Sequence, residues 1–157
     1  NHQADAENDR RRQFVKNMAI DAWKAYKANA FGANNLKPKT QTSDRYGGGT
    51  ESAGGLTLIK SMSTLWLMDL KEEFELSRQW VANKFDFANS NNHAYVFVAA
   101  TEYLGSFLSC YALTNDSLFL NKAREVATAL KPAFNTNTGM SISSNFDDIL
   151  SNILILF

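Results

Sequence analysis

The stretch Val96-Phe97-Val98-Ala99-Ala100-Thr101-Glu102-Tyr103-Leu104-Gly105-Ser106-Phe107-Leu108-Ser109-Cys110-Tyr111-Ala112-Leu113 decides how the chain folds. Its apolar residues recur at intervals of three and four, which is the repeat of an α-helix; they stand at positions 97, 100, 104, 107, 108 and 111. Because few of the other positions are polar, we expect a largely buried helix in the core. Thr114-Asn115-Asp116 then supplies a turn and a new helix cap, so the segment is expected to begin a helical hairpin.

Further helices are expected on both sides of this segment, at residues 9–30, 56–70, 71–85 and 117–132. The helix at 56–70 is apolar nearly all round, which predicts burial on most sides. In the first helix one face carries the apolar side chains, namely Phe14, Met18, Ala22, Trp23, Tyr26 and Ala30. Residues 41–55 hold five glycines and are expected to form a loop. Strand signals are nearly absent, so the predicted fold class is all-α, built as successive helical hairpins.

Composition limits the possible functions. A chain of 157 residues predicts one domain, and its formal net charge of zero argues against a nucleic-acid partner or an anionic membrane surface. The single cysteine, Cys110, excludes a disulfide within the chain and is expected to be a small buried hydrophobe. No apolar run is expected to span a bilayer, although a leader or anchor could precede Asn1. The apolar residues 153–157 suggest a chain that stops inside a larger fold.

The sequence contains no HExxH, nucleotide-binding loop, GxSxG or Cys/His cluster. His2 and His93 are expected to be ordinary surface histidines. Glu102 is the exceptional carboxylate because it lies on the core helix, where it could act as a general acid or, in the favoured interpretation, form a structural pair. Asn115-Asp116-Ser117 is an N-glycosylation acceptor motif, which matters only if the chain enters the secretory pathway.

Many ordered pieces of the chain match one family. The chain resembles the N-terminal part of a class I α-1,2-mannosidase of glycoside hydrolase family 47, nearest to the endoplasmic-reticulum type, over nearly all of residues 10–140. The pieces that carry the resemblance are Asp21-Ala22-Trp23-Lys24-Ala25-Tyr26, Asn35-Leu36-Lys37-Pro38, Gly55-Leu56-Thr57-Leu58-Ile59, Lys71-Glu72-Glu73-Phe74-Glu75-Leu76-Ser77-Arg78-Gln79-Trp80-Val81, Val96-Phe97, Leu108-Ser109-Cys110-Tyr111-Ala112-Leu113, Asp116-Ser117-Leu118-Phe119-Leu120-Asn121-Lys122-Ala123 and Pro132-Ala133-Phe134.

The resemblance implies an (α/α)7 barrel, a helical toroid of which residues 1–157 would form a partial, N-terminal fragment. It further implies high-mannose N-glycans on glycoproteins as substrates, a place in the secretory pathway, and a calcium ion whose ligand region lies beyond this chain. Family members hydrolyse the glycosidic bond with inversion, so that one carboxylic acid protonates the leaving oxygen and a second carboxylate activates water. The later carboxylates of the family are likewise absent from this chain.

The chain departs from the family at its polar functional positions. Where the family carries its catalytic acid, this chain has Val98, and the arginine four residues later is Glu102. An Asp-x-x-Asp-Thr pattern of the family is replaced by Lys60-Ser61-Met62-Ser63-Thr64. An acidic pair is replaced by Asn34-Asn35, and a histidine by Asp21. Glu102 lies about 6 Å along the helix from position 98, too far to replace the acid. We therefore assign no catalytic, cofactor-binding or metal residue and expect no hydrolysis.

Two alternatives to an inactive mannosidase-like protein stay open. One is a non-catalytic module that binds glycans or glycoproteins. The other is a helical interaction domain that docks on another subunit. A partial ring would leave apolar faces in water, at about 25 cal/mol per Å², so self-association through these faces is expected.

Overall fold

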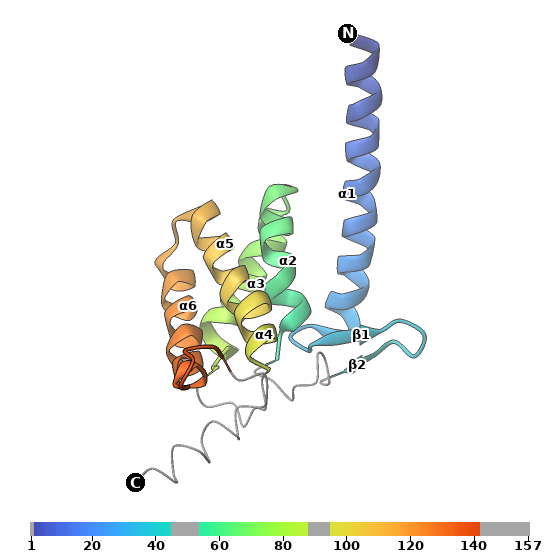
Figure 1. The fold of residues 1–157 in the computed structure, drawn as a ribbon. Helices are drawn as coiled ribbons and strands as arrows, with labels where there is room; N and C mark the ends of the chain where they lie inside the picture. The colour runs from blue at the N-terminus through green and yellow to red at the C-terminus, as the bar shows by residue number, and fades with distance from the viewer. Residues whose placement is uncertain (1, 45–53, 88–94, 142–157) are drawn as a thin grey trace.

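The computed structural model describes residues 2–44, 54–87 and 95–141 (Figure 1). Its helices are α1 (His2–Ala30), α2 (Leu56–Leu67), α3 (Lys71–Lys84), α4 (Val96–Val98), α5 (Gly105–Thr114) and α6 (Ser117–Leu130), with a π-helical segment η1 (Ala99–Leu104) and a final 3-10 turn η2 (Lys131–Phe134). The predicted fold class, all-α with successive hairpins, is confirmed. His93 and residues 153–157 lie outside the described residues.

Helices α2 to α6 pack side by side, whereas the first half of α1 projects away from them (Figure 1). This projecting first half of α1 is called the arm below. Helix α1 begins at His2, before the predicted start at Asp9. Only its last part packs on the core, where Trp23, Tyr26 and Ala30 are buried. The prediction that Phe14 and Met18 belong to the core face is wrong, because no described element covers this half of the helix; Phe14 is 67% exposed.

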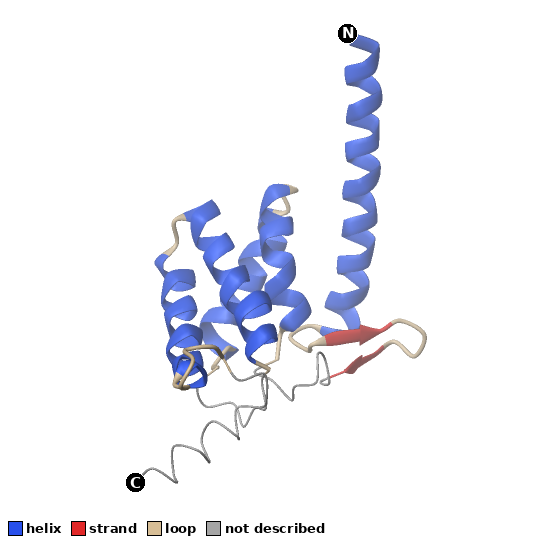
Figure 2. Ribbon diagram, in the orientation of Figure 1, coloured by secondary structure: helices blue, strands red, loops and turns tan. Residues whose placement is uncertain are grey.

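A two-stranded hairpin follows α1 and was missed by the sequence prediction (Figure 2). Strands β1 (Asn35–Lys37) and β2 (Thr42–Asp44) pair antiparallel, with Leu36 opposite Ser43, and the Lys37 ammonium lies 3.5 Å from the Asp44 carboxylate. Strands this short contain too few residues to give a period-two pattern, and most of these side chains are polar, which removes the usual signal. The loop predicted for residues 41–55 is therefore wrong at residues 42–44.

The core helix predicted from the opening stretch is present, but its buried face differs from the prediction. Helices α4 and α5 are joined by η1 into one helix, whose buried side chains are Val96, Ala99, Tyr103, Phe107 and Cys110. Phe97 and Leu108 were expected in the core but are 75% and 46% exposed. Because π-helical hydrogen bonds run from i to i+5, each turn takes more residues than an α-turn, and the residues before η1 are rotated relative to those after it.

The hairpin of α5 and α6 forms as predicted. Asn115 adopts the left-handed conformation, with φ 56°, and ends α5. Asp116 caps α6 by accepting a hydrogen bond from the Leu118 backbone N–H, and its second oxygen lies 2.5 Å from Arg78 Nε. This ion pair connects the hairpin to α3. Phe119, Ala123, Val126 and Leu130 form the buried stripe of α6.

The backbone of two glycines packs closely against a tryptophan side chain where α1, α2 and α3 come together. Gly32 and Gly55 both have positive φ, and the Gly55 N–H donates to the Gly32 carbonyl at 2.9 Å. The Trp80 ring of α3 lies against both glycines. A Cβ atom added to Gly32 would come within 2.4 Å of the ring, and one added to Gly55 within 2.5 Å. Only glycine fits both the conformation and the space here.

The segment Val96–Thr114 is long and apolar enough to cross a membrane, judged by length and composition alone. This finding contradicts the expectation that no apolar run would suffice. A core helix passes the same test, and here five side chains of the segment are buried among the neighbouring helices.

Candidate functional site

Val98, the position that the resemblance assigns to the proton donor, lies at the end of α4 and is half-buried. Its side chain lines a shallow groove of about 460 Å³ together with Tyr95, Phe97, Ala100 and Phe134. No carboxylate is among the lining residues in the described part of the chain. An aliphatic side chain in apolar surroundings can neither deliver nor accept a proton, so none of the described residues that line this groove is a general acid.

Glu102 is held by an ion pair. It lies one helical turn beyond Val98, on η1, and its Oε2 atom is 2.5 Å from Lys60 Nζ on α2. Both side chains are partly exposed, 49% for Lys60 and 28% for Glu102, so the pair is at the edge of the helix–helix contact. Glu102 thus has the charged partner that the favoured interpretation expected. Sequence reasoning did not find Lys60 as that partner, although the opposite charges on two expected helices were a usable signal.

Three other positions at which the chain departs from the family pattern, Asn34, Ser61 and Asp21, lie in surroundings of different kinds. Asn34 is buried, and its side-chain oxygen accepts from the Leu56 N–H while its carbonyl accepts from the Thr57 hydroxyl, so it caps the start of α2. Ser61 donates to the Thr57 carbonyl within α2, at 2.6 Å. Asp21 is exposed on α1. Of these residues, only Lys60 and Glu102 are brought together as a charged pair.

One acidic side chain of α3 is turned toward α1. Glu73 of α3 is half-buried, accepts from the Trp23 indole N–H at 2.7 Å, and lies 3.0 Å from Lys27 Nζ. Burial alone would raise the pKa of Glu73, but the hydrogen bonds from Trp23 and Lys27, with the charge of Lys27, lower it overall. Glu73 therefore joins α1 to α3 as a permanent anion, which is a structural role.

Two further ionisable side chains, Cys110 and Tyr26, are buried. Cys110 is buried, and desolvation raises the pKa of its thiol to about 12, which confirms the expected buried hydrophobe. Burial also raises the pKa of Tyr26 to about 12; its hydroxyl donates to the Ala33 carbonyl and accepts from the Gly32 N–H. His2 is the first residue of α1.

A calcium ion does not fit the described residues. Calcium takes six to eight oxygen ligands, several of them carboxylates. Within residues 2–44, 54–87 and 95–141, no group of three or more histidine, cysteine, aspartate or glutamate side chains could hold a metal ion. The family's metal therefore enters no step that we assign to this chain.

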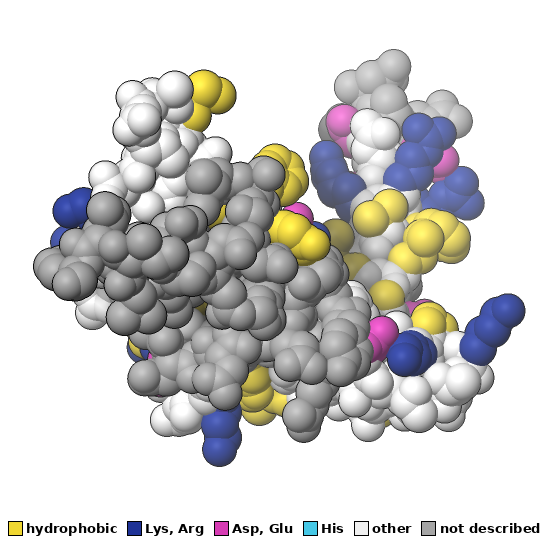
Figure 3. Space-filling view, turned by 60° about the horizontal axis from the view of Figure 1, so that its bottom comes forward, with side chains coloured by type: hydrophobic (Ala, Val, Ile, Leu, Met, Phe, Trp, Pro, Cys, Tyr) yellow, Lys and Arg dark blue, Asp and Glu magenta, His cyan; other side chains and the backbone are white. Residues whose placement is uncertain are grey.

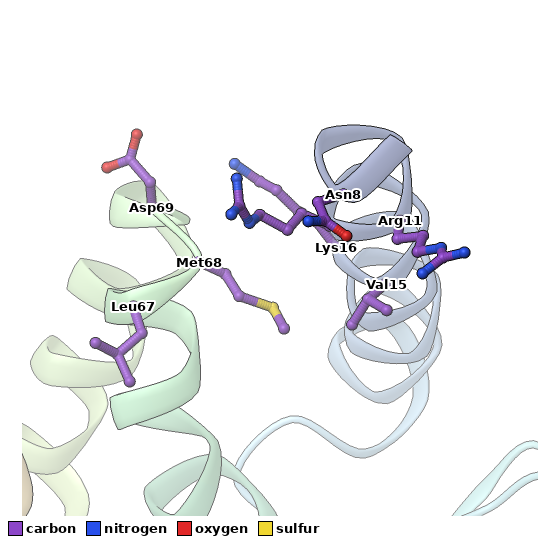
Figure 4. A pocket seen from close by; sticks show the side chains of 8 residues that line it. Asn8, Arg11, Val15, Lys16, Leu67, Met68 and Asp69 are labelled. Atoms are coloured by element: carbon purple, nitrogen blue, oxygen red, sulfur yellow. The ribbon is translucent and has the colours of Figure 1, made fainter. Parts of the chain in front are cut away.

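A larger groove, of about 590 Å³, lies between the arm of α1 and the end of α2 (Figure 4). Val15, Leu67 and Met68 provide apolar walls, while Arg11, Arg12, Lys16 and Asp69 line its charged edge. In the space-filling view, hydrophobic and basic side chains lie together along the arm (Figure 3). Arg11 and Arg12 are already paired with Glu7 and Asp9 on their own helix. The groove offers contact surface but no reactive group.

Comparison with known proteins gives one consistent family. The sequence profile of glycosyl hydrolase family 47 matches residues 18–147. The mannosyl-oligosaccharide 1,2-alpha-mannosidase mans-2 of Caenorhabditis elegans is 43% identical over 145 residues, which are 91% of this chain and 24% of the relative. The human endoplasmic reticulum mannosyl-oligosaccharide 1,2-alpha-mannosidase is 37% identical over 80% of this chain and 17% of its own length. The chain thus spans about a quarter or less of the length of these curated relatives.

A solved structure agrees with the sequence matches. An alpha-1,2-mannosidase from Trichoderma reesei superposes with a TM-score of 0.68 at 28% identity, covering 83% of this chain and 30% of that protein. The matched part of the chain therefore shares its fold with a member of the (α/α)7 barrel class. From the matched profile, the relatives and the shared fold, the chain belongs to glycosyl hydrolase family 47.

Proposed function

We propose that this chain is a mannosidase-family protein of the secretory pathway that does not hydrolyse glycosidic bonds. Relatives named as endoplasmic reticulum mannosidases support the location, and their names support high-mannose glycans as the related ligand class. The observation that carries the proposed inactivity is Val98, which stands at the position of the catalytic acid in the resemblance.

The chemistry of the reaction makes this substitution decisive. Inverting glycosidases place two carboxyl groups about 6.5–9.5 Å apart, one to protonate the leaving oxygen and one to activate water. Val98 has no exchangeable proton. Glu102 is the nearest carboxyl group along the helix, but it lies one helical turn from position 98 and is held in an ion pair, with its oxygen 2.5 Å from the Lys60 ammonium. We infer that the described surface contains no acid for this reaction.

The test is direct. Circular dichroism first verifies that the purified chain is folded. The chain is then incubated with a high-mannose oligosaccharide and calcium, and released mannose is measured. We expect no release above the buffer blank, while the Trichoderma relative under the same conditions provides the positive control. Mannose release that persists in the Glu102→Gln variant would refute the argument from Val98. Release that this variant abolishes would instead identify Glu102 as an acid and refute the argument from the Lys60 ion pair.

A binding role without hydrolysis is a second candidate, and exposed apolar surface favours a protein partner. Phe14, Val15 and Met18 are exposed on the arm of α1, and Leu67 is exposed across the groove. Light scattering at rising protein concentration tests self-association, and replacing Val15 by Asp should weaken it. Calorimetry with the same oligosaccharide tests the alternative glycan-binding role.

A further inference from the structure

We propose that Asn115, in the turn between α5 and α6, carries an N-linked glycan. The inference rests on the proposed function in one respect, since the modification requires entry into the secretory pathway. Asn115-Asp116-Ser117 is the one acceptor motif in the sequence. A motif of three residues occurs often by chance, so the argument depends on how the structure treats each of its members.

The fold leaves the acceptor side chain unused. Asn115 is exposed, and among the described contacts its only hydrogen bond is from its backbone N–H to the Tyr111 carbonyl, at 2.7 Å. Asparagine in such a turn commonly caps the following helix through its side chain, but here Asp116 caps α6. The neighbouring Thr114 hydroxyl donates to the Cys110 carbonyl. The local polar contacts are therefore satisfied without the Asn115 amide.

The third member of the motif is equally accessible. Ser117 is the first residue of α6 and is exposed, and no described contact engages its hydroxyl. Asp116, the middle residue, turns its carboxylate toward Arg78 and the Leu118 N–H. The two side chains that the transfer reaction needs thus face solvent, while the one it does not need holds the turn. A glycan on Asn115 would displace no described packing contact.

The position also keeps a glycan clear of the candidate site. Asn115 directly follows the helix that contains Val98, and the two positions are about 25 Å apart along the axis at the rise of an α-helix. Figure 1 shows the α5–α6 turn and α4 at opposite ends of the bundle. The α5–α6 turn is also separate from the groove between α1 and α2, because α2 lies between α1 and this turn in the same view (Figure 1).

The chemistry is a simple group transfer. The Asn115 amide nitrogen attacks the anomeric carbon of an oligosaccharide that is carried on a lipid diphosphate, so a C–N bond forms and the bond from that carbon to the diphosphate oxygen breaks. The amide loses one proton, and the lipid diphosphate leaves with the electron pair of the broken bond. No oxidant or reductant is needed.

The experiment translates the chain behind a cleavable signal peptide in the presence of endoplasmic-reticulum microsomes. Protection from added protease identifies the molecules that have entered the lumen, and a second version with an appended Asn-Ala-Thr acceptor shows that the microsomes are competent. We expect one glycan that peptide N-glycosidase F removes. Asn115→Gln and Ser117→Ala should each abolish it, while Asn121→Gln, on the exposed surface of α6 and outside any motif, should retain it.

Protease-protected chain without a glycan, made by microsomes that modify the appended acceptor, would overturn the proposal. So would a glycan that survives in Asn115→Gln. Because the signal peptide supplies entry, these outcomes do not depend on where the natural chain resides. Failure of the proposed location is recognised separately, as a chain that is modified in microsomes but never enters the secretory pathway in cells.

Discussion

Substituting Gly55 by alanine should be among the most damaging single changes in this chain. The new Cβ atom would lie 2.5 Å from Cη2 and Cζ3 of Trp80, and atoms at that separation overlap strongly. Gly55 also has a φ of 71°, a region that costs a residue with a Cβ atom about 1 kcal/mol. Overpacking of this kind adds roughly 1–3 kcal/mol. We expect a loss of about 3 kcal/mol in the free energy of unfolding, out of a total of about 5–15 kcal/mol for a typical domain.

The matched control is Gly139→Ala. Gly139 has nearly the same conformation, with a φ of 70°, but nothing lies within 4 Å of its added Cβ atom. The free energy of unfolding of this variant should therefore fall only by the cost of the left-handed backbone conformation, about 1 kcal/mol or less. The measurement is urea unfolding followed by far-ultraviolet circular dichroism, with the slope m compared among variants to check that the unfolded states are alike.

A second-site change separates the clash from the backbone strain. Trp80→Leu shortens the side chain that the alanine would meet, so the double variant Gly55→Ala with Trp80→Leu should be more stable than the sum of the single losses predicts. Equal losses of unfolding free energy in Gly55→Ala and Gly139→Ala, or strict additivity in the double variant, would refute the argument that Trp80 leaves no space for a Cβ atom at position 55.

Three further outcomes are expected. Asp116→Ala should lower the free energy of unfolding by about 1–2 kcal/mol, and Asp116→Asn by less, because the amide oxygen can still accept the cap hydrogen bond. The hydrogen bond from Arg78 holds the pKa of Asp116 low, so the stability advantage of Asp116 over Asn is present above about pH 4 and is lost as the pH falls through that lowered pKa. Thermal unfolding of both proteins across this pH range measures the difference. Lys60→Glu and Glu102→Lys should each destabilise the fold, and the double reversal should restore stability. A double-mutant cycle should give a coupling energy of about 0.5–1 kcal/mol, and added salt should reduce it. A coupling energy of zero would mean that the pair contributes nothing to stability. Cys110 should react with a disulfide reagent only as urea unfolds the chain, and rapid labelling of the native protein would contradict its burial.

The sequence predicted those parts of the fold that depend on regular periodicity. The helices near residues 71–85 and 117–130 lie where their apolar stripes placed them, and Asp116 caps the hairpin as expected. These elements follow one repeat from end to end, so the buried face can be read from residue spacing alone.

Prediction failed where the local pattern does not determine the partner. Phe14 belongs to an apolar face, but whether such a face is buried depends on which element lies opposite, and no described element covers it. Glu73 gives no sign in the sequence of its contacts, which come from Trp23 and Lys27 of α1. Contacts between residues far apart in sequence leave no trace in periodicity.

For the candidate site, the sequence led to the expectation of a missing acid, and the structure shows the surroundings of that position. Val98 was singled out by comparison with the family pattern, because no spacing rule draws attention to a valine. The Lys60–Glu102 pair required the relative placement of two helices, which the sequence indicates only as opposite charges on separate segments.

The π-helical turn at Ala99–Leu104 makes the core helix unusually tolerant of a shortened chain. Removing one residue from an α-helix such as α6 rotates everything beyond it by about 100°, which would carry Phe119 or Val126 out of the core. In the π-helical turn the same deletion can be absorbed, because a turn closed from i to i+5 can become one closed from i to i+4. Loss of the exposed Thr101 should therefore leave Phe107 and Cys110 in place, making this turn the position in the helix where relatives of different length can share one packing arrangement.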